Sequence, residues 1–224
     1  MRELWDGIRR RADGPAELTA DVIRLVAALC IPIAAIGWGP LGGVSLAFAT
    51  GGMVLPRALR VRPGFDIAFG IVTLIAVWSS VIDLYVTVRW WDLPVHFALN
   101  GLVAAMGYLL LVHFDIVADA RGLPRPMLST TIVTTALGLS FGVVWEMFEW
   151  FGKTFIDGEI YVGYTDSIGD LLWGGFGSLL AGLAMPWIAA HPRSAGAAAD
   201  AAPPGRTAAA PDGPRPRPRP GPAD

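Results

Sequence analysis

Apolar residues in this chain gather into long runs that are separated by short polar segments. Six runs come close to the roughly 20 residues that a helix needs to cross the hydrocarbon core of a membrane. They are Val22–Trp38, Leu41–Leu55, Phe65–Tyr85, Leu93–Phe114, Met127–Phe151 and Ile168–Ala189. The first two are short and are joined by Gly39-Pro40, so a single broken hairpin is the alternative to two separate spans. The pattern predicts an all-α polytopic transmembrane bundle of about six spans embedded in a lipid bilayer.

The composition supports a membrane protein over a soluble one. Apolar residues make up 54% of the chain and charged residues 16%, whereas soluble domains carry about a quarter charged residues. The net charge of −2 gives no support for a nucleic-acid partner. Cys30 is the sole cysteine, which excludes a disulfide within the chain.

Three regions follow from this pattern. Residues 1–21 form a cytoplasmic arm, residues 22–190 the transmembrane domain, and residues 191–224 a Pro-, Ala- and Arg-rich tail that we expect to be disordered. Acidic residues in the arm argue against a cleaved signal peptide. Leu4, Trp5 and Ile8, together with nearby arginines, could form an interfacial helix, and a frayed basic arm is the alternative.

The positions of the arginines predict the orientation of the chain. Basic clusters precede the first run, follow the second and the fourth, and recur in the tail. The loops on the opposite side contain only two basic residues, Arg89 and Lys153. With six spans, every basic cluster falls on one side of the membrane, which predicts that both termini are cytoplasmic.

Ionisable residues inside the predicted spans gather at the extracytoplasmic ends of the last four. Such residues are costly in a membrane and usually face a partner or a cavity. The candidates are Asp83, Asp92, His96, Asn100, Glu146, Glu149, Asp166 and Asp170. Their spacing of three or four residues places those of each span on one helical face.

Oxygen-rich clusters with one imidazole suit a divalent cation such as Mg, Mn, Ca or Zn, so a metal cofactor is one interpretation. We name His96, Glu146, Glu149, Asp166 and Asp170 as candidate ligands, with Asp83, Asp92 and Asn100 in support. A proton-relay site is a second interpretation, because packed carboxylates change each other's proton affinities. Solvation at the membrane surface would explain Asp92, Asp166 and Glu149, whereas Glu146 and Asp170 lie deeper.

At these residues the chain resembles a known family. The pattern consists of Asp92-x-x-x-His96-Phe97-x-x-x-Gly101, then Trp145-Glu146-x-x-Glu149, then Asp166-x-x-x-Asp170. It is similar to the YjdF-type integral membrane proteins and, more distantly, to VanZ-like proteins. Such families often have an asparagine soon after the last aspartate, where this chain has Trp173. The resemblance implies a bacterial inner-membrane protein whose activity is not established.

Three functions remain open from the sequence. In the first, a cation site acts on or binds a lipid or a lipid-linked envelope substrate, with Glu146, Glu149 and Asp170 as ligands or general bases and His96 as ligand or proton donor. The second is a proton- or cation-coupled transporter, although the cytoplasmic halves of the spans lack matching polar residues. The third is a scaffold without catalysis, in which the acids only bond neighbouring helices. The sequence does not decide whether the protein is an enzyme.

Overall fold

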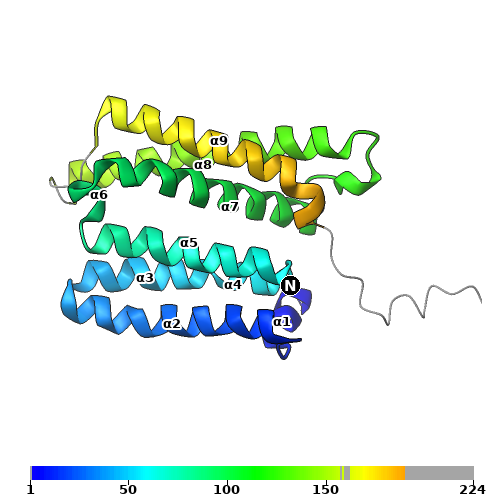
Figure 1. The fold of residues 1–224 in the computed structure, drawn as a ribbon, viewed down its shortest axis with the longest axis horizontal. Coiled ribbons are helices and arrows are strands. Elements are labelled where there is room, and N and C mark those ends of the chain that lie inside the picture. The colour runs from blue at the N-terminus through cyan, green and yellow to red at the C-terminus, as the bar shows by residue number, and fades with distance from the viewer. Residues whose placement is uncertain (1, 157, 159–161, 190–224) are drawn as a thin grey trace, which may run out of the picture. The chain divides into compact units, whose positions relative to one another are not determined.

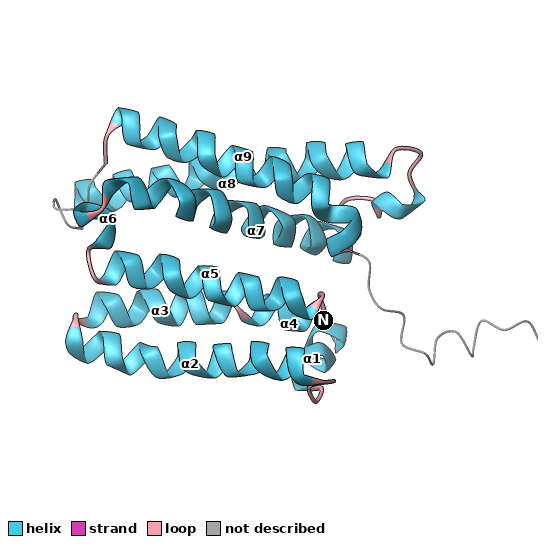
Figure 2. Cartoon of the chain, in the orientation of Figure 1, coloured by secondary structure: helices cyan, strands magenta, loops and turns pink. Residues whose placement is uncertain are grey.

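The computed structural model describes residues 2–156, 158 and 162–189 of the chain. In these residues the secondary structure consists of helices joined by short loops (Figure 2). The predicted tail, 191–224, lies outside the described residues, as do Asp157 and residues 159–161 of the loop before the last helix.

The first half of the fold is a bundle built around three antiparallel helices (Figure 1). Helices α2, α3 and α5 all contact one another, and the short α1 packs on α4. The bounds are α1 Arg2–Arg9, α2 Pro15–Gly37, α3 Pro40–Gly52, α4 Val54–Ala58 and α5 Pro63–Val81. A proline opens α2, α3 and α5, where its missing N–H costs no hydrogen bond.

The second half repeats the three-helix arrangement with longer helices. Helix α9 contacts both α7 and α8 extensively, and α5 connects the two halves by packing on α7. The bounds are α6 Leu84–Thr87, η1 Arg89–Trp91, α7 Asp92–His113, η2 Ala120–Gly122, α8 Pro126–Phe155 and α9 Tyr164–Ile188.

Five helices in the described part of the chain are long and apolar enough to cross a membrane. They are α2, α5, α7 together with η1, α8 and α9, and they match five of the six predicted spans. The predicted span Leu41–Leu55 is instead divided between α3 and α4, which together run from Pro40 to Ala58. The all-α membrane bundle is therefore confirmed, with five candidate spans in the described residues, and a sixth span through α3 and α4 stays a prediction.

A proline explains the break between α3 and α4. Pro56 has no backbone N–H, and its ring would clash with the carbonyl of Gly52 in a continuous helix. The preceding Gly51-Gly52 pair lowers helix propensity further. The carbonyl oxygen of Met53, at the break, instead accepts a hydrogen bond of 2.9 Å from Arg24 Nε.

Small residues let α7, α8 and α9 approach closely. A Cβ on Gly101 would lie 2.7 Å from the backbone oxygen of Gly177, and a Cβ on Gly138 would lie 1.9 Å from Ser178 Oγ. Backbones that meet at glycine exclude water and fix the relative position of the helices. The close packing of α7, α8 and α9 therefore brings the polar groups at one end of these helices close together.

The outer faces of the helices are apolar. Exposed side chains on α8 include Val143, Val144, Met147 and Phe148, and α2 exposes Leu25 and Leu29. Apolar surface on this scale belongs in contact with lipid, so it agrees with a bundle that lies in a bilayer.

Candidate functional site

Six ionisable side chains of the second half lie at one end of the bundle, and we call them the acidic cluster. Helices α7 and α9 begin at this end and α8 ends there (Figure 1). The members are Asp92, His96, Glu146, Glu149, Asp166 and Asp170. All six were candidate site residues from the sequence.

Three members of the cluster have the spacing of metal ligands. Asp92, His96 and Asp170 each offer one ligand atom that lies within 4.8 Å of the other two. Asp92 Oδ1 is 3.4 Å from His96 Nε2, one turn along α7. Ligands about 2.1 Å from an ion lie roughly 3.0–3.4 Å apart when they are adjacent, so this pair could share an ion with little movement.

Asp170 is the most unusual member because it is buried without a partner. Its side chain belongs to a residue that is 2% exposed, and neither carboxylate oxygen has a hydrogen-bond partner among the described residues. Glu146 Oε2 is likewise buried and unpaired there. Burying a carboxylate without a compensating partner costs several kcal/mol, so both groups call for a ligand or a proton.

The remaining acids have partners in the surrounding helices. Glu149 accepts a hydrogen bond of 2.9 Å from Trp145 Nε1. The Glu146 side chain is also hydrogen bonded to Ser167. Asp166 is attracted by the charges of Arg89 and Lys153, which lie at the outer edge of the cluster.

Repulsion couples the members of the acidic cluster. Asp170 interacts unfavourably with the charges of Asp92, Asp166, Glu146 and Glu149. The five carboxylates therefore oppose one another in the folded protein. A bound cation would relieve that repulsion.

Two supporting candidates lie elsewhere. Asp83 is exposed at the turn between α5 and α6, where its φ of 56° is in the left-handed region. Asn100 lies deeper, one turn below His96 on α7. Its amide donates hydrogen bonds to the Gly138 oxygen, at 3.0 Å, and to Ser178 Oγ, at 3.4 Å. Asn100 therefore joins α7 to α8 and α9 beneath the acidic cluster.

Tyr85 is a neighbour of the cluster that the sequence did not indicate. It lies in α6, outside the five candidate spans, and its hydroxyl donates a hydrogen bond of 2.9 Å to the Ala76 oxygen. Burial raises the pKa of the phenol, and the charges of Asp92, Glu149 and Asp170 raise it further. Tyr85 therefore stays protonated. In the sequence it was only the last residue of the predicted span Phe65–Tyr85, and nothing there indicated a place beside the acidic cluster.

A second set of charges, which we call the arginine network, lies at the other end of the bundle. Arg24 of α2 forms ion pairs with Asp66 of α5 and with Asp21, the latter at 2.8 Å. Arg57 of α4 lies 3.2 Å from Asp21 and 3.7 Å from Glu17. These contacts tie α2, α4 and α5 together.

The arginine network also holds the N-terminal helix. Arg10, just after α1, forms two short hydrogen bonds of 2.6 and 2.7 Å with the carboxylate of Glu17. Arg57 Nη2 donates a further hydrogen bond of 2.7 Å to the Arg10 backbone oxygen. The members are Arg10, Glu17, Asp21, Arg24, Arg57 and Asp66. Three arginines balance three acids, so the network has no net charge.

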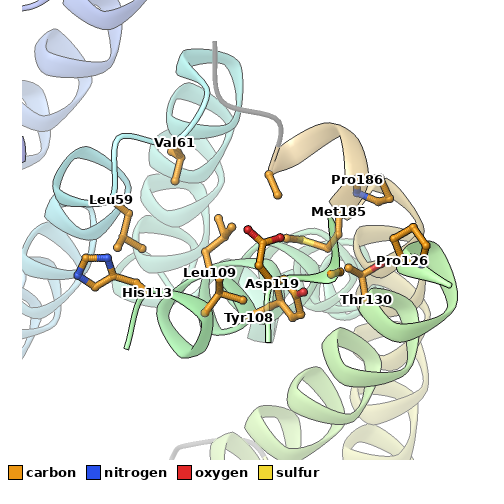
Figure 3. Close-up of a pocket in the computed structure, with 13 residues that line it drawn as sticks. Leu59, Val61, Tyr108, Leu109, His113, Asp119, Pro126, Thr130, Met185 and Pro186 are labelled. Carbon is orange, nitrogen blue, oxygen red and sulfur yellow. The ribbon is translucent and has the colours of Figure 1, made fainter. Parts of the chain in front are cut away.

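The cavity found in the bundle is separate from the acidic cluster. It has a volume of about 400 Å³ and lies beside the last turn of α7, at His113, whereas the cluster lies beside the first (Figure 3). Leu109 and Met185 form part of an apolar lining that Asp119 and Thr130 interrupt. None of the candidate site residues lines it.

The fold and the cluster define a polytopic α-helical membrane protein with an acidic site at one end of its bundle. The chain belongs to the family of predicted membrane proteins DUF2238, whose model matches residues 22–191. This membership agrees with the resemblance to YjdF-type proteins, whereas the more distant resemblance to VanZ-like proteins stays a prediction. The chain matches neither a curated protein nor a solved structure.

Proposed function

We propose that this protein binds a divalent cation in the acidic cluster, on the extracytoplasmic side of a bacterial inner membrane, and uses it to bind or act on the headgroup of a lipid or lipid-linked substrate. The observation that carries the proposal is the buried Asp170: both of its oxygens are unpaired among the described residues, and one of them lies within 4.8 Å of a ligand atom of Asp92 and of His96. We call Asp92, His96 and Asp170 the triad. A bound cation or a proton would balance the buried Asp170 carboxylate, and we propose the cation.

The depth of the cluster supports a headgroup as substrate. Trp90, Trp145 and Trp150 are all exposed around the same end of the bundle, as are the residues that open α9. Tryptophan is enriched at the level of lipid headgroups. The tryptophans therefore support a site at the depth of lipid phosphate and sugar groups rather than of acyl chains.

The positions of the arginines support the proposed side. The arginine network and Arg11 and Arg60 lie at the end of the bundle opposite the acidic cluster. Arginine-rich loops favour the cytoplasm. The acidic cluster then faces the extracytoplasmic side, and the N-terminus is cytoplasmic.

Thermal unfolding in detergent, with and without Mg²⁺, Mn²⁺, Ca²⁺ or Zn²⁺, tests the cation site. A ligand present at 100 times its Kd stabilises the folded state by about 2.7 kcal/mol, so at least one of these ions should raise the Tm of the wild-type protein. Asp170→Asn should abolish that rise. Asp21→Asn, the same change in the arginine network, is the matched control and should keep it.

A wild-type protein indifferent to all four ions would contradict the proposal. That result would favour the scaffold interpretation if Asp170→Asn also lowered the Tm. It would favour a proton-carrying site if the Tm of the wild type, but not of Asp170→Asn, depended on pH.

A further inference from the structure

We infer that the cation is a transition metal such as zinc, held by Asp92, His96 and Asp170 alone, with its remaining coordination positions open to water or substrate. This inference rests on the proposed function, since it names the chemistry of the same site. It differs from a calcium or magnesium site that serves only to neutralise the acids.

The donor atoms favour a transition metal. One imidazole nitrogen joins two carboxylates in the triad. Imidazole suits Zn, Fe and similar ions, whereas Ca²⁺ takes six to eight oxygens and Mg²⁺ keeps most of its own waters. His96 would be a poor choice of ligand for either of the latter two ions.

The three other acids do not complete the first coordination shell. Glu149 accepts a hydrogen bond from the Trp145 indole, and Glu146 is hydrogen bonded to Ser167. Asp166 is attracted by the charges of Arg89 and Lys153. The triad therefore supplies three ligands. Structural zinc sites are closed by four protein ligands, whereas catalytic sites keep three and leave a position for water.

Glu146 is placed to orient such a water. Its Oε2 is buried without a partner among the described residues, and its charge opposes those of Asp92 and Asp170. A metal-bound water is a strong hydrogen-bond donor, and an outer carboxylate commonly accepts from it. We assign Glu146 this positioning role rather than a place among the ligands.

Metal competition in detergent tests the class of the ion. The wild-type protein should bind Zn²⁺ at least about tenfold more tightly than Mg²⁺ and Ca²⁺. His96→Asp, which makes the triad all oxygen, should lose most of that preference, because the nitrogen donor carries it. His113→Asp changes the histidine at the other end of α7 and should leave the preference intact.

Cobalt spectroscopy tests the open positions. Co²⁺ bound to the wild-type protein should give a visible absorption spectrum that shifts on addition of azide, because azide replaces a bound water. Glu146→Gln should still bind Co²⁺, with an affinity lowered by about 10- to 100-fold, and should show a weaker response to azide. A spectrum that azide does not change would overturn the open site.

Two outcomes separate this inference from the proposed function. Tightest binding of Ca²⁺ or Mg²⁺, with His96→Asp unaffected, would overturn the transition-metal assignment and leave a cation site in place. Binding of none of the ions would overturn both.

Discussion

The two three-helix halves have their buried polar groups in corresponding places, but the charges are balanced in the first half and not in the second. Each half places them near the start of its first and third helices and at the end of its second passage, formed by α3 and α4 in the first half and by α8 in the second. Asp66 lies in the first turn of α5, whereas Asp92 opens α7 after α5 has ended, so the two sets lie at opposite ends of the bundle (Figure 1). The arginine network balances three arginines with three acids, while the acidic cluster contains five carboxylates and one histidine.

This difference shows that the arginine network, unlike the acidic cluster, has its charges balanced by residues of the chain itself. A buried ion pair is stable because each charge is the other's partner, and removing one member leaves the other uncompensated. The arginine network meets this condition and therefore holds helices together. Among the described residues, Asp170 of the acidic cluster does not meet it, which is why we propose that a cation from outside the chain balances this carboxylate.

Removal of the central arginine should have the largest effect on stability. Arg24→Met leaves Asp66 buried without its ion pair and removes the bond to the Met53 oxygen. We expect the free energy of unfolding to fall by about 3–5 kcal/mol, measured by denaturant unfolding in mixed micelles. Arg11→Met, at an exposed arginine, should change it by less than about 0.5 kcal/mol.

Removing both members of the Arg24–Asp66 ion pair should lower the free energy of unfolding less than removing Arg24 alone. Arg24→Met combined with Asp66→Leu removes both charges, and replacing a buried pair by apolar groups is often nearly neutral. The double variant should therefore recover most of the stability lost in Arg24→Met. A double variant as unstable as the single one would show that Arg24 contributes mainly through its other contacts.

Close packing beneath the acidic cluster gives the next largest effect. Gly138→Ala places a methyl group 1.9 Å from Ser178 Oγ, whereas a methyl group at Gly51 meets nothing within 4 Å. Gly138→Ala should destabilise the protein by about 1–3 kcal/mol, and Gly51→Ala should be neutral or slightly stabilising. Cation binding should weaken only in Gly138→Ala, because α8 and α9 would separate.

Neutralising the buried aspartate of the acidic cluster should have a smaller effect of opposite sign. Asp170→Asn removes repulsion with four neighbouring carboxylates. Without metal we expect the variant to be more stable than the wild type, because the asparagine carries no buried charge for the neighbouring carboxylates to repel. A clear loss of stability in metal-free buffer would mean that Asp170 is bonded as a scaffold group.

Single introduced cysteines should leave stability unchanged. Their labelling should show on which side of the membrane the acidic cluster and the arginine network lie. In a Cys30→Ala background, Thr165→Cys at the start of α9 should react with an impermeant maleimide from outside the inner membrane. Arg11→Cys should react only after the membrane is opened. The reverse pattern would place the acidic cluster in the cytoplasm.

The spans and the acidic cluster could be predicted from the sequence because both leave local signals. Hydropathy marks a span, and the four-residue spacing of Asp92 with His96 and of Asp166 with Asp170 marks a helical face. The break between α3 and α4 was less visible, because it falls inside the apolar run Leu41–Leu55 whereas the proline that explains it, Pro56, lies just after that run. A hydropathy window averages over such a residue.

The arginine network could not be predicted because the pairs that join different helices are distant in the chain. Arg24 and Asp66 are single charges within apolar runs, 42 residues apart, and each alone suggests nothing. Their meeting depends on how α2 packs against α5. For the same reason, the sequence placed Asp83 with the candidate site, whereas the turn before α6 leaves it exposed.

Metal content measured on matched variants tests the central claim most directly. The wild-type protein, dialysed against Zn²⁺ or Mn²⁺ in detergent and analysed by mass spectrometry, should hold one ion per chain. Asp170→Asn should hold none, while Asp21→Asn, the same substitution in the arginine network, should still hold one. Equal metal content in all three proteins, or none in the wild type, would contradict the account.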